Sequence, residues 1–451
     1  MLYPPIQPRL DDLREGRRSS AEEVERCLSA ALDPAGEGVR VFTRLSAAKA
    51  REEAAAWDRR RSQGSEGGVL GGLPVSVKDL FDIAGEATLA GSLVLAGSPS
   101  ADRDSTVVRR LREAGAVIVG RTNMTEFAYS GLGLNPHYGT PKNPYDRATG
   151  RISGGSSSGA AVSVTDGMAA VGLGTDTGGS VRIPAALCGL VGFKPTSSRV
   201  PREGMVPLSP SLDSIGPIAP TVACCALVDA VLAGETPRKL VPPPMRSLRL
   251  GVLQGYVLEG LDETVQTAFR SSLQRVAEAG ATLDEVHFSR LELVPQSNQF
   301  AAAEAFAWHR DLLALHGERY DPHVAARIRY GAETLAADYL DMLRSRRECI
   351  AEARTSFARF DAILLPSVPW IAPSIADLEA SDAAYFVANG AMLRNTSLFN
   401  FLDGCALSVP CHAAGKAPVG LMIAGLGGQD AQVLAIGAAI EAVLSNPLSN
   451  L

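Results

Sequence analysis

Along residues 71–174, short apolar segments typical of strands occur before and after a segment typical of a helix. This order of segments constrains the fold more than any other feature of the sequence. In the first apolar segment, large apolar residues alternate over 73–77, which indicates a strand that ends at Lys78. Residues 106–114 have helical character and follow it. Two more segments have the composition of short buried strands, 116–120 and 168–174. Strands and helices in this order predict an α/β layered fold.

Similar segments continue to the C-terminal part of the chain. Residues 301–360 are dominated by helix formers and are expected to form a helical layer, whereas 131–160 are rich in Gly, Pro, Asn and Ser and are expected to be largely loop. The other expected strands are 248–252, 281–286, 362–365 and 419–424, and the other expected helices are 46–63, 161–165, 263–279 and 430–444. Residues 237–244 could be a linker, but composition does not change across them, so we expect one large α/β domain.

The first thirty residues suggest an extended start followed by a helix. Pro4, Pro5 and Pro8 favour extended backbone. Ser20 and Glu23 then match a capping box, and apolar residues at helical spacing follow them.

Charge, cysteine content and hydropathy exclude several functional classes. A net charge of −6 gives no electrostatic reason to expect nucleic acid or an anionic membrane as a partner. The seven cysteines are scattered without a C-x-x-C pair, and the six histidines lie outside the two glycine- and serine-rich motifs described below, so no metal site is expected. No run of about 18 apolar residues is present, and the N-terminal residues lack a signal-peptide core. We therefore expect a cytoplasmic protein without a metal or cofactor.

Two motifs rich in glycine and serine could form a reactive site. The first, GGSSSG at 154–159, runs directly into AAVSV and so opens an ordered element; a flexible loop is the alternative. The second, GTDTGGSVRIPA at 174–185, follows a buried strand, and its adjacent glycines let backbone N–H groups converge as an oxyanion hole requires. Asp176 and Arg182 could pair and stabilise this turn; the alternative is a purely structural turn with a surface ion pair.

Lys78 ends an apolar segment in a chain that uses far more arginine than lysine. A free lysine, with a pKa of about 10.4, is a poor base. Burial lowers the pKa and makes the amine a usable base. The alternative is an ordinary lysine that extends to the surface.

Taken together, these motifs resemble the amidase signature family. The resemblance covers nearly the whole chain and is densest from about 70 to 220. The segments that carry it are GLPVSVKDLFD (72–82), GRTNMTEFAY (120–129), NPHYGTPKNPYD (135–146), GGSSSGAA (154–161), GTDTGGSVRIPA (174–185), GLVGFKPT (189–196), VPLSPSLDSIGPIAPTV (206–222) and PVGLMIAG (418–425). It implies a single amidase domain over 1–451, with a large mixed β-sheet core covered by helices on both sides.

The resemblance also assigns roles to individual residues. It implies a Ser–Ser–Lys triad in which Ser180 is the nucleophile, Ser156 bridges it to the base and Lys78 is the base. The expected oxyanion hole consists of the backbone N–H groups of Thr177, Gly178, Gly179 and Ser180. The expected supporting residues are Ser157, Thr175, Asp176 and Arg182, and the expected pocket residues are Met124, Phe127 and Tyr129.

The implied activity is hydrolysis of a carboxylic amide or a related C–N bond through an acyl-enzyme, with linear amides as the class. The expected partner is a small-molecule amide or carbamate, and ureido acids, urethanes and esters remain open as substrates. No nucleic acid, membrane or cofactor is required. A homodimer is one assembly that the sequence allows.

Three alternatives remain beside this interpretation. Residues 155–159 match G-x-S-x-G, with Ser157 as the nucleophile of an α/β-hydrolase, but that elbow must follow a buried strand and 143–153 are polar and turn-forming. A nucleotide-binding protein would need G-x-x-x-x-G-K-[ST], which is absent from the sequence. Within the family, the chain could be the glutaminase-type component of a tRNA-dependent amidotransferase. That component typically has Tyr-Gly-Arg where this chain has Ser197, Ser198 and Arg199.

Overall fold

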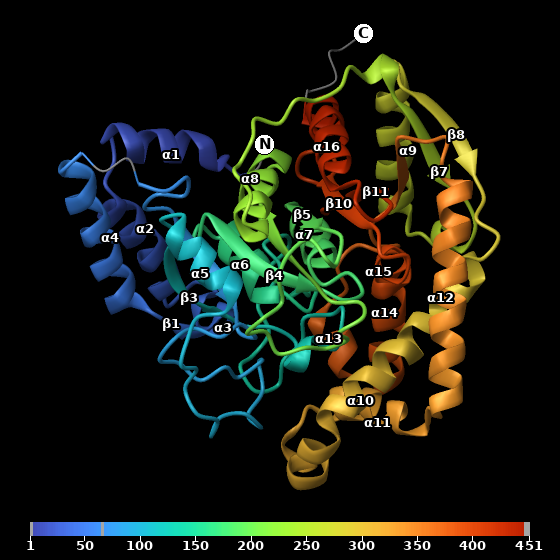
Figure 1. Cartoon of the computed structure of the whole chain (residues 1–451), viewed down its shortest axis with the longest axis horizontal. Coiled ribbons are helices and arrows are strands. Elements are labelled where there is room, and N and C mark those ends of the chain that lie inside the picture. Colours follow the sequence, from blue (N-terminus) through green and yellow to red (C-terminus); the bar gives the residue numbers. More distant parts are fainter. Residues whose placement is uncertain (1–2, 65–66, 446–451) are drawn as a thin grey trace.

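An eleven-stranded mixed sheet forms the centre of the structure, a computed structural model that describes residues 3–64 and 67–445 (Figure 1). Its strands are β1 (Phe42–Leu45), β2 (Pro74–Lys78), β3 (Val117–Thr122), β4 (Val171–Asp176), β5 (Val191–Lys194), β6 (Ser214–Ala219), β7 (Arg249–Leu253), β8 (Thr282–Val286), β9 (Ala362–Pro366), β10 (Cys405–Pro410) and β11 (Gly420–Gly425). The order across the sheet is β1-β3-β2-β4-β6-β5-β10-β11-β9-β7-β8. β2 pairs in parallel with β3 and β4, and β7 pairs in parallel with β8 and β9, whereas the other neighbours are antiparallel.

Helices cover both faces of this sheet. The helices are α1 (Ile6–Glu15), α2 (Ser20–Leu32), α3 (Gly38–Val41), α4 (Ala47–Ser62), α5 (Thr106–Glu113), α6 (Ser158–Thr165), α7 (Arg182–Cys188), α8 (Val222–Ala233), α9 (Glu263–Glu278), α10 (Ser297–His316), α11 (Pro322–Tyr330), α12 (Ala336–Ser356), α13 (Ile375–Glu379), α14 (Asp382–Arg394), α15 (Ser397–Phe401) and α16 (Asp430–Ser445). α8 contacts both α5 and α16, and α16 also contacts α9. α6 and α7 contact each other and pack on β4 and β5 respectively. The mixed α/β architecture expected from the resemblance is confirmed.

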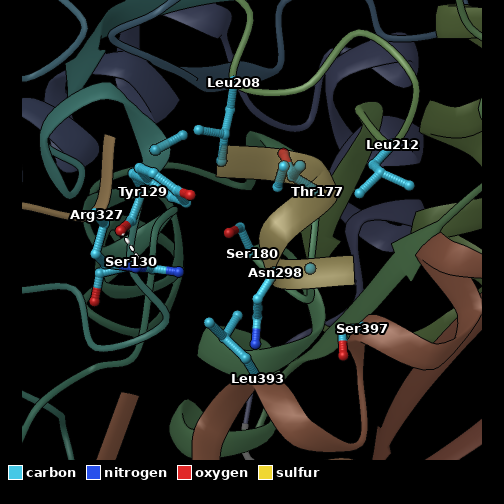
Figure 2. Close-up of a pocket in the computed structure, with 13 residues that line it drawn as sticks. Tyr129, Ser130, Thr177, Ser180, Leu208, Leu212, Asn298, Arg327, Leu393 and Ser397 are labelled. Atoms are coloured by element: carbon cyan, nitrogen blue, oxygen red, sulfur yellow. Dashed lines mark hydrogen bonds between the residues drawn. The ribbon is translucent and has the colours of Figure 1, made fainter. Parts of the chain in front are cut away.

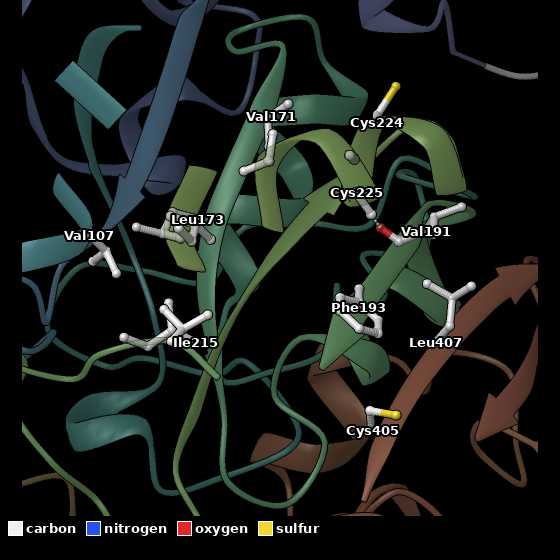
Figure 3. Close-up of a cluster of buried hydrophobic side chains, with 14 of the residues drawn as sticks. Val107, Val171, Leu173, Val191, Phe193, Ile215, Cys224, Cys225, Cys405 and Leu407 are labelled. Atoms are coloured by element: carbon white, nitrogen blue, oxygen red, sulfur yellow. Dashed lines mark hydrogen bonds between the residues drawn. The ribbon is translucent and has the colours of Figure 1, made fainter. Parts of the chain in front are cut away.

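The residues of β4 alternate in size, and this alternation sets how closely helices approach the two faces. Val171 and Leu173 belong to the large buried cluster that also contains Cys225 of α8 (Figure 3). Burial of a leucine of this kind contributes about 1.5–3 kcal/mol to stability. Gly172 faces the opposite side of the sheet, which α6 covers. A Cβ at this position would lie 2.6 Å from the backbone oxygen of Ala160 in α6. Glycine at this position therefore lets α6, and the loop in front of it, lie close to the sheet.

The expected strands and helices are present with ends shifted by a few residues, and four strands were not predicted. The missed strands are β1, β5, β6 and β10. β5 and β6 lie inside the motifs GLVGFKPT and VPLSPSLDSIGPIAPTV, whose glycines and prolines mask the strand pattern. Residues 237–244 form an irregular connection between α8 and β7.

Two expectations about the N-terminal part of the chain were wrong. α1 begins at Ile6 and contains Pro8, although the prolines suggested extended backbone. Pro8 lies in the first helical turn, where the backbone N–H groups have no intrahelical partner, so the missing donor costs nothing. The capping box of α2 uses Ser19 and Glu22 rather than Ser20 and Glu23. The Ser20 hydroxyl instead donates to the Gly72 carbonyl, 2.8 Å away.

The helical segment expected over 301–360 is formed by α10 and α11, at the lower right of Figure 1, and by α12, which runs along its right side. α10 contacts both α11 and α12. Among all the described residues, no helix is both long enough and apolar enough to cross a bilayer.

Candidate active site

Parallel pairing of β2 and β4 brings the ends of two predicted motifs together. Val77 lies opposite Leu173 in the ladder, so Lys78 at the end of β2 reaches the level of Thr175 near the end of β4. The Lys78 side chain is fully buried. Its Nζ donates to Ser156 Oγ at 2.7 Å and to Thr175 Oγ1 at 2.8 Å.

The Lys78 amine lies in a site that favours its neutral form. Burial lowers its pKa to about 7, although the negative charges of Asp176 and Asp213 act in the opposite direction. Within residues 3–64 and 67–445, no carboxylate forms an ion pair with it. An amine with this pKa is substantially neutral at and above pH 7 and can accept a proton.

Ser156 and Ser157 lie in the loop that leads into α6. Both are fully buried. The backbone N–H of Ser157 donates to the Ser180 carbonyl at 3.3 Å, and its hydroxyl donates to the Thr175 carbonyl at 3.3 Å. Ser157 thus connects the end of β4 to the turn that carries Ser180. The hydroxyls of Ser156 and Ser180 are not joined by a direct hydrogen bond in the described part of the chain.

The same loop argues against the α/β-hydrolase alternative. A nucleophile elbow requires a strand immediately before the serine. The described residues 143–157 contain no strand, only single bridges at Arg151 and Ile152. The buried Ser157 hydroxyl also has a structural partner in Thr175.

Asp176 organises the turn between β4 and α7. Its carboxylate pairs with Arg182 at 2.8 Å, and both side chains are fully buried. It also accepts hydrogen bonds from the Gly179 N–H at 2.8 Å and from Asn400 Nδ2 at 2.9 Å. Burial by itself raises the pKa of Asp176, but the charge and hydrogen bonds of Arg182 outweigh this effect and keep the pKa at about 2. The carboxylate is therefore ionised at neutral pH and aligns the turn.

The structure divides the four predicted oxyanion donors into two groups. The Gly179 N–H already donates to Asp176 and so is not free to bind a substrate oxygen. Among the described acceptors, backbone and side chain, none takes a hydrogen bond from the backbone N–H groups of Thr177, Gly178 or Ser180. Gly179 has a φ of 134°, and a Cβ there would lie 2.1 Å from Thr396 Oγ1, so both backbone and packing require glycine.

Three residues that sequence reasoning missed support this turn. Asp213 accepts a hydrogen bond from Thr177 Oγ1 at 2.6 Å, and burial raises the pKa of Asp213 to about 6. Thr396 Oγ1 donates to the Gly178 carbonyl at 2.6 Å, and Asn400 Nδ2 donates to the backbone oxygen of Asp176 at 3.0 Å. Asp213 lies in a motif that marked the family, but Thr396 and Asn400 come from the far end of the chain and had no local signal.

A cavity opens beside Ser180 and contains about 410 Å³ of space not filled by atoms, part of it open to solvent (Figure 2). The described residues that line it are Ala128, Tyr129, Ser130, Thr177, Gly178, Ser180, Leu208, Leu212, Asn298, Ala301, Arg327, Leu393 and Ser397. Ser180 itself is only 3% exposed, so a substrate must enter this cavity to reach the hydroxyl.

Of the three predicted pocket residues, only Tyr129 lines the cavity. Met124 is fully buried in the core. Phe127 is also in the core, because its ring packs 4.4 Å from the His309 ring and 5.2 Å from the Tyr320 ring, centroid to centroid. The lining residues from α10, α11 and α14 were not predicted individually, since no local motif marks them.

The described residues contain no cluster of three or more His, Cys, Asp or Glu side chains that could bind a metal ion. The groups assembled at the cavity are instead hydroxyls, backbone N–H groups and one buried amine. This arrangement is suited to nucleophilic attack by a serine and to stabilisation of an oxyanion.

Comparison with known proteins shows the family of the chain. The model of the Amidase family matches residues 24–434, so the chain belongs to this family and is an amidohydrolase of the amidase signature class. It is 38% identical to a 2-amino-5-chloromuconic acid deaminase from Comamonas testosteroni, over 88% of this chain and 87% of the relative. It is 34% identical to the A component of the glutamyl-tRNA(Gln) amidotransferase from Chloroflexus aggregans, over 96% of this chain and 94% of the relative. It also resembles an amidase crystal structure, with a TM-score of 0.89 and 33% identity over 98% of this chain and all of that one.

Proposed function

We propose that the chain hydrolyses the amide bond of a small molecule through an acyl-enzyme on Ser180, with Ser156 as proton bridge and Lys78 as base. The observation that carries the proposal is the position of Lys78. It is a buried amine whose two partners are hydroxyls, Ser156 and Thr175, rather than carboxylates. A lysine placed in this way can exchange a proton with its neighbours.

The proton path starts from neutral Lys78. The amine accepts the proton of Ser156, which accepts the proton of Ser180 as the Ser180 oxygen attacks the amide carbonyl. Because no direct hydrogen bond joins the hydroxyls of Ser156 and Ser180 in the described part of the chain, the second transfer requires these hydroxyls to approach each other, for example by a change of rotamer.

The developing oxyanion is expected to bind the free N–H groups of the turn. The donors with no internal acceptor among the described residues are those of Thr177, Gly178 and Ser180. Each such donor contributes roughly 3–4 kcal/mol to transition-state stabilisation. Ser156 then returns the proton to the leaving amine, and water hydrolyses the acyl-enzyme by the same relay.

Linear amides are the substrate class that we propose first, with carbamates (urethanes) and esters as further members of a test panel. The cavity beside Ser180 suits a small substrate. The Comamonas testosteroni relative is named for deamination of an unsaturated acid, 2-amino-5-chloromuconic acid, which supports a small substrate that loses ammonia.

The direct test is labelling with a fluorophosphonate probe, followed by mass spectrometry and by turnover of the amide panel. The wild-type protein and a Ser198→Ala control, which removes an exposed hydroxyl, should be labelled on Ser180 and be active. Ser180→Ala should lose labelling and at least about 10⁴-fold in turnover while its thermal unfolding stays unchanged. Labelling of Ser157, with full activity in Ser180→Ala, would overturn the assignment.

A second candidate function is that of the glutaminase component in a tRNA-dependent amidotransferase. The observation that favours it is the 34% identity to such a component over 96% of this chain. Purification from the native host distinguishes the two functions. Copurification of transferase components, with glutamine hydrolysis only in the complex, supports this candidate, whereas amide hydrolysis by the isolated chain supports the free-standing enzyme.

A further inference from the structure

Arg327 of α11 is the one charged side chain among the described residues that line the cavity beside Ser180. It also lines an adjoining cavity, whose described walls include Tyr330 and Phe386 and again contain no other charged side chain. Figure 2 shows Arg327 across the cavity from Thr177, with Ser180 between them. The opposite side of the cavity thus bears hydroxyls and backbone N–H groups, whereas this side bears a guanidinium.

The guanidinium of Arg327 has no carboxylate partner within residues 3–64 and 67–445. Its Nη1 donates to the backbone oxygen of Tyr129, and its central carbon lies 4.1 Å from the centroid of the Tyr129 ring. A guanidinium has five N–H donors in a rigid fork, so most of them remain available. A cation that is half-buried and faces a cavity without a counterion favours an anionic ligand.

The fold positions this arginine through the same loop that supplies Tyr129. The buried carboxylate of Glu126 accepts a hydrogen bond from Ser92 Oγ at 2.6 Å and from the Asp321 N–H at 2.7 Å. Asp321 is the N-cap of α11, and its side chain accepts from the His323 N–H at 2.8 Å. The start of α11 is therefore connected to the loop next to Ser180, which limits how far Arg327 can move.

We propose that Arg327 binds a carboxylate of the substrate, so that the substrate class is a small amide that also carries a carboxylate, as in the half-amide of a dicarboxylic acid. This inference rests on the proposed function, because it places the anionic group in the same cavity as the Ser180 nucleophile. The wall of the same cavity also contains the apolar side chains of Leu208, Leu212 and Leu393, which suit a short carbon chain. The Asn298 side chain, which lines both cavities, is a further polar contact for the carboxylate.

The first experiment compares half-amides with their neutral methyl esters, using malonamate, succinamate and glutaramate. The wild-type enzyme should have the higher kcat/KM for the carboxylate form of at least one pair. Arg327→Gln should lower the ratio of the two kcat/KM values roughly 10- to 100-fold, the loss typical of a charged hydrogen bond. Arg327→Lys keeps the positive charge but loses the planar pair of N–H donors, so its ratio of the two kcat/KM values should lie between those of the wild type and Arg327→Gln.

The matched control is Arg329→Gln, which removes an exposed positive charge from the same helix. The ratio of kcat/KM for the half-amide to kcat/KM for its methyl ester should remain within about twofold of the wild-type ratio in this variant. An equal loss in Arg329→Gln would mean that the net charge of α11, rather than contact with Arg327, sets the preference. Thermal unfolding of every variant separates loss of binding from loss of folding.

The second experiment measures binding without turnover. Calorimetry with succinate should detect binding to Ser180→Ala and none to the Ser180→Ala, Arg327→Gln double variant. Succinate binding without hydrolysis of any amide would contradict the proposed function and leave the carboxylate site standing. Hydrolysis that prefers the neutral esters, with a ratio unchanged in Arg327→Gln, would overturn the carboxylate site and leave the hydrolase standing.

Discussion

Two buried lysines occupy similar positions in the sheet and have different surroundings. Lys78 is the last residue of β2, and Lys194 is the last residue of β5. Burial lowers the pKa of both amines, to about 7 for Lys78 and to about 8 for Lys194, where the charge of Arg182 adds to the effect of burial. By position, burial and charge alone, either lysine could be a base.

The hydrogen-bond partners distinguish them. Lys78 Nζ contacts the hydroxyls of Ser156 and Thr175, which can both donate and accept a proton. Lys194 Nζ donates to the carbonyls of Pro195, at 2.8 Å, and Gly404, at 2.6 Å. A carbonyl can only accept, so Lys194 is suited to link two chain segments, whereas Lys78 is suited to transfer a proton. Burial alone therefore does not make a lysine a base.

Among the changes that test the comparison of the two lysines, replacement of Lys78 is expected to have the largest effect. Lys78→Ala should lose about 10³-fold or more in turnover, because proton transfer and nucleophile activation fail together. Lys78→Arg should be nearly as harmful, since a guanidinium stays protonated and cannot accept a proton. The measurement is steady-state kinetics on the best amide of the panel. If Lys78→Arg kept most of the activity, Lys78 would act only as a positive charge.

Ser156 tests whether Lys78 acts through a shared relay. Ser156→Ala should cost roughly 10²- to 10³-fold, and combining it with Lys78→Ala should add much less than a second loss of that size, because both residues serve one proton path. A double-mutant cycle of kcat/KM measures this coupling. Fully additive losses would show that the two residues act independently.

The pH dependence gives a smaller, graded effect. The base must be neutral, so kcat/KM should fall about tenfold per pH unit as the pH drops below the Lys78 pKa of about 7, and should level off above it. Asp213→Asn removes a negative charge that raises the Lys78 pKa and should shift this acid limb to lower pH. Profiles from pH 5 to 9, in steps of roughly half a unit, check both points. An acid limb that stays in place in Asp213→Asn would indicate that another group titrates.

The smallest effect concerns stability and separates the two lysines most directly. Lys194→Met should destabilise the fold by about 1–3 kcal/mol, because two buried carbonyls lose their donor. Lys78→Met should not destabilise it, since the hydroxyls of Ser156 and Thr175 can reorient toward other partners. The pKa of Lys78 is about 7 in the folded state and 10.5 in the unfolded state, so between these pH values only the unfolded chain binds the proton. The free energy of unfolding of the wild type should therefore rise from about pH 7 to 10.5. The stability of Lys78→Met relative to the wild type should be greatest below about pH 7.

Urea unfolding of the wild type and the two methionine variants at pH 6 and 9 measures these differences. Amide hydrolysis by folded Lys194→Met is the control, and it should stay within about tenfold of wild type because Lys194 does not contact the cavity. Equal destabilisation in both variants at both pH values would contradict the distinction between the two lysines.

Sequence patterns predicted the strands that lead to Lys78 and Thr175, because those strands depend on nearby residues. The alternation before Lys78 predicted β2, and the apolar segment before Thr175 predicted β4. By contrast, glycine and proline within β5 and β6 obscured the strand pattern, because those strands are specified by their neighbours in the sheet rather than by propensity. The short helix α1 was missed because a proline is harmless in a first helical turn.

The candidate site also contains residues that the sequence predicted and contacts that it did not. Lys78, Ser156 and Ser180 lie in motifs whose resemblance to a family suggested their roles from the sequence. Contacts between distant segments had no such signal, including Thr396 with Gly178 and Arg327 with Tyr129. Phe127 shows the converse error, because an aromatic residue next to the site packs into the core.

The sequence by itself therefore determined the family, the α/β class and the chemical groups available for amide hydrolysis, since these depend on residue types at short spacing. Only the tertiary structure decided which buried lysine contacts hydroxyls, that the Gly179 N–H is already bonded to Asp176, and that an arginine about 150 residues beyond Ser180 lines the same cavity. The physical reason is that a pKa, a free N–H donor and an unpaired charge depend on every group within a few ångströms, and the folded chain brings most of those groups from distant segments.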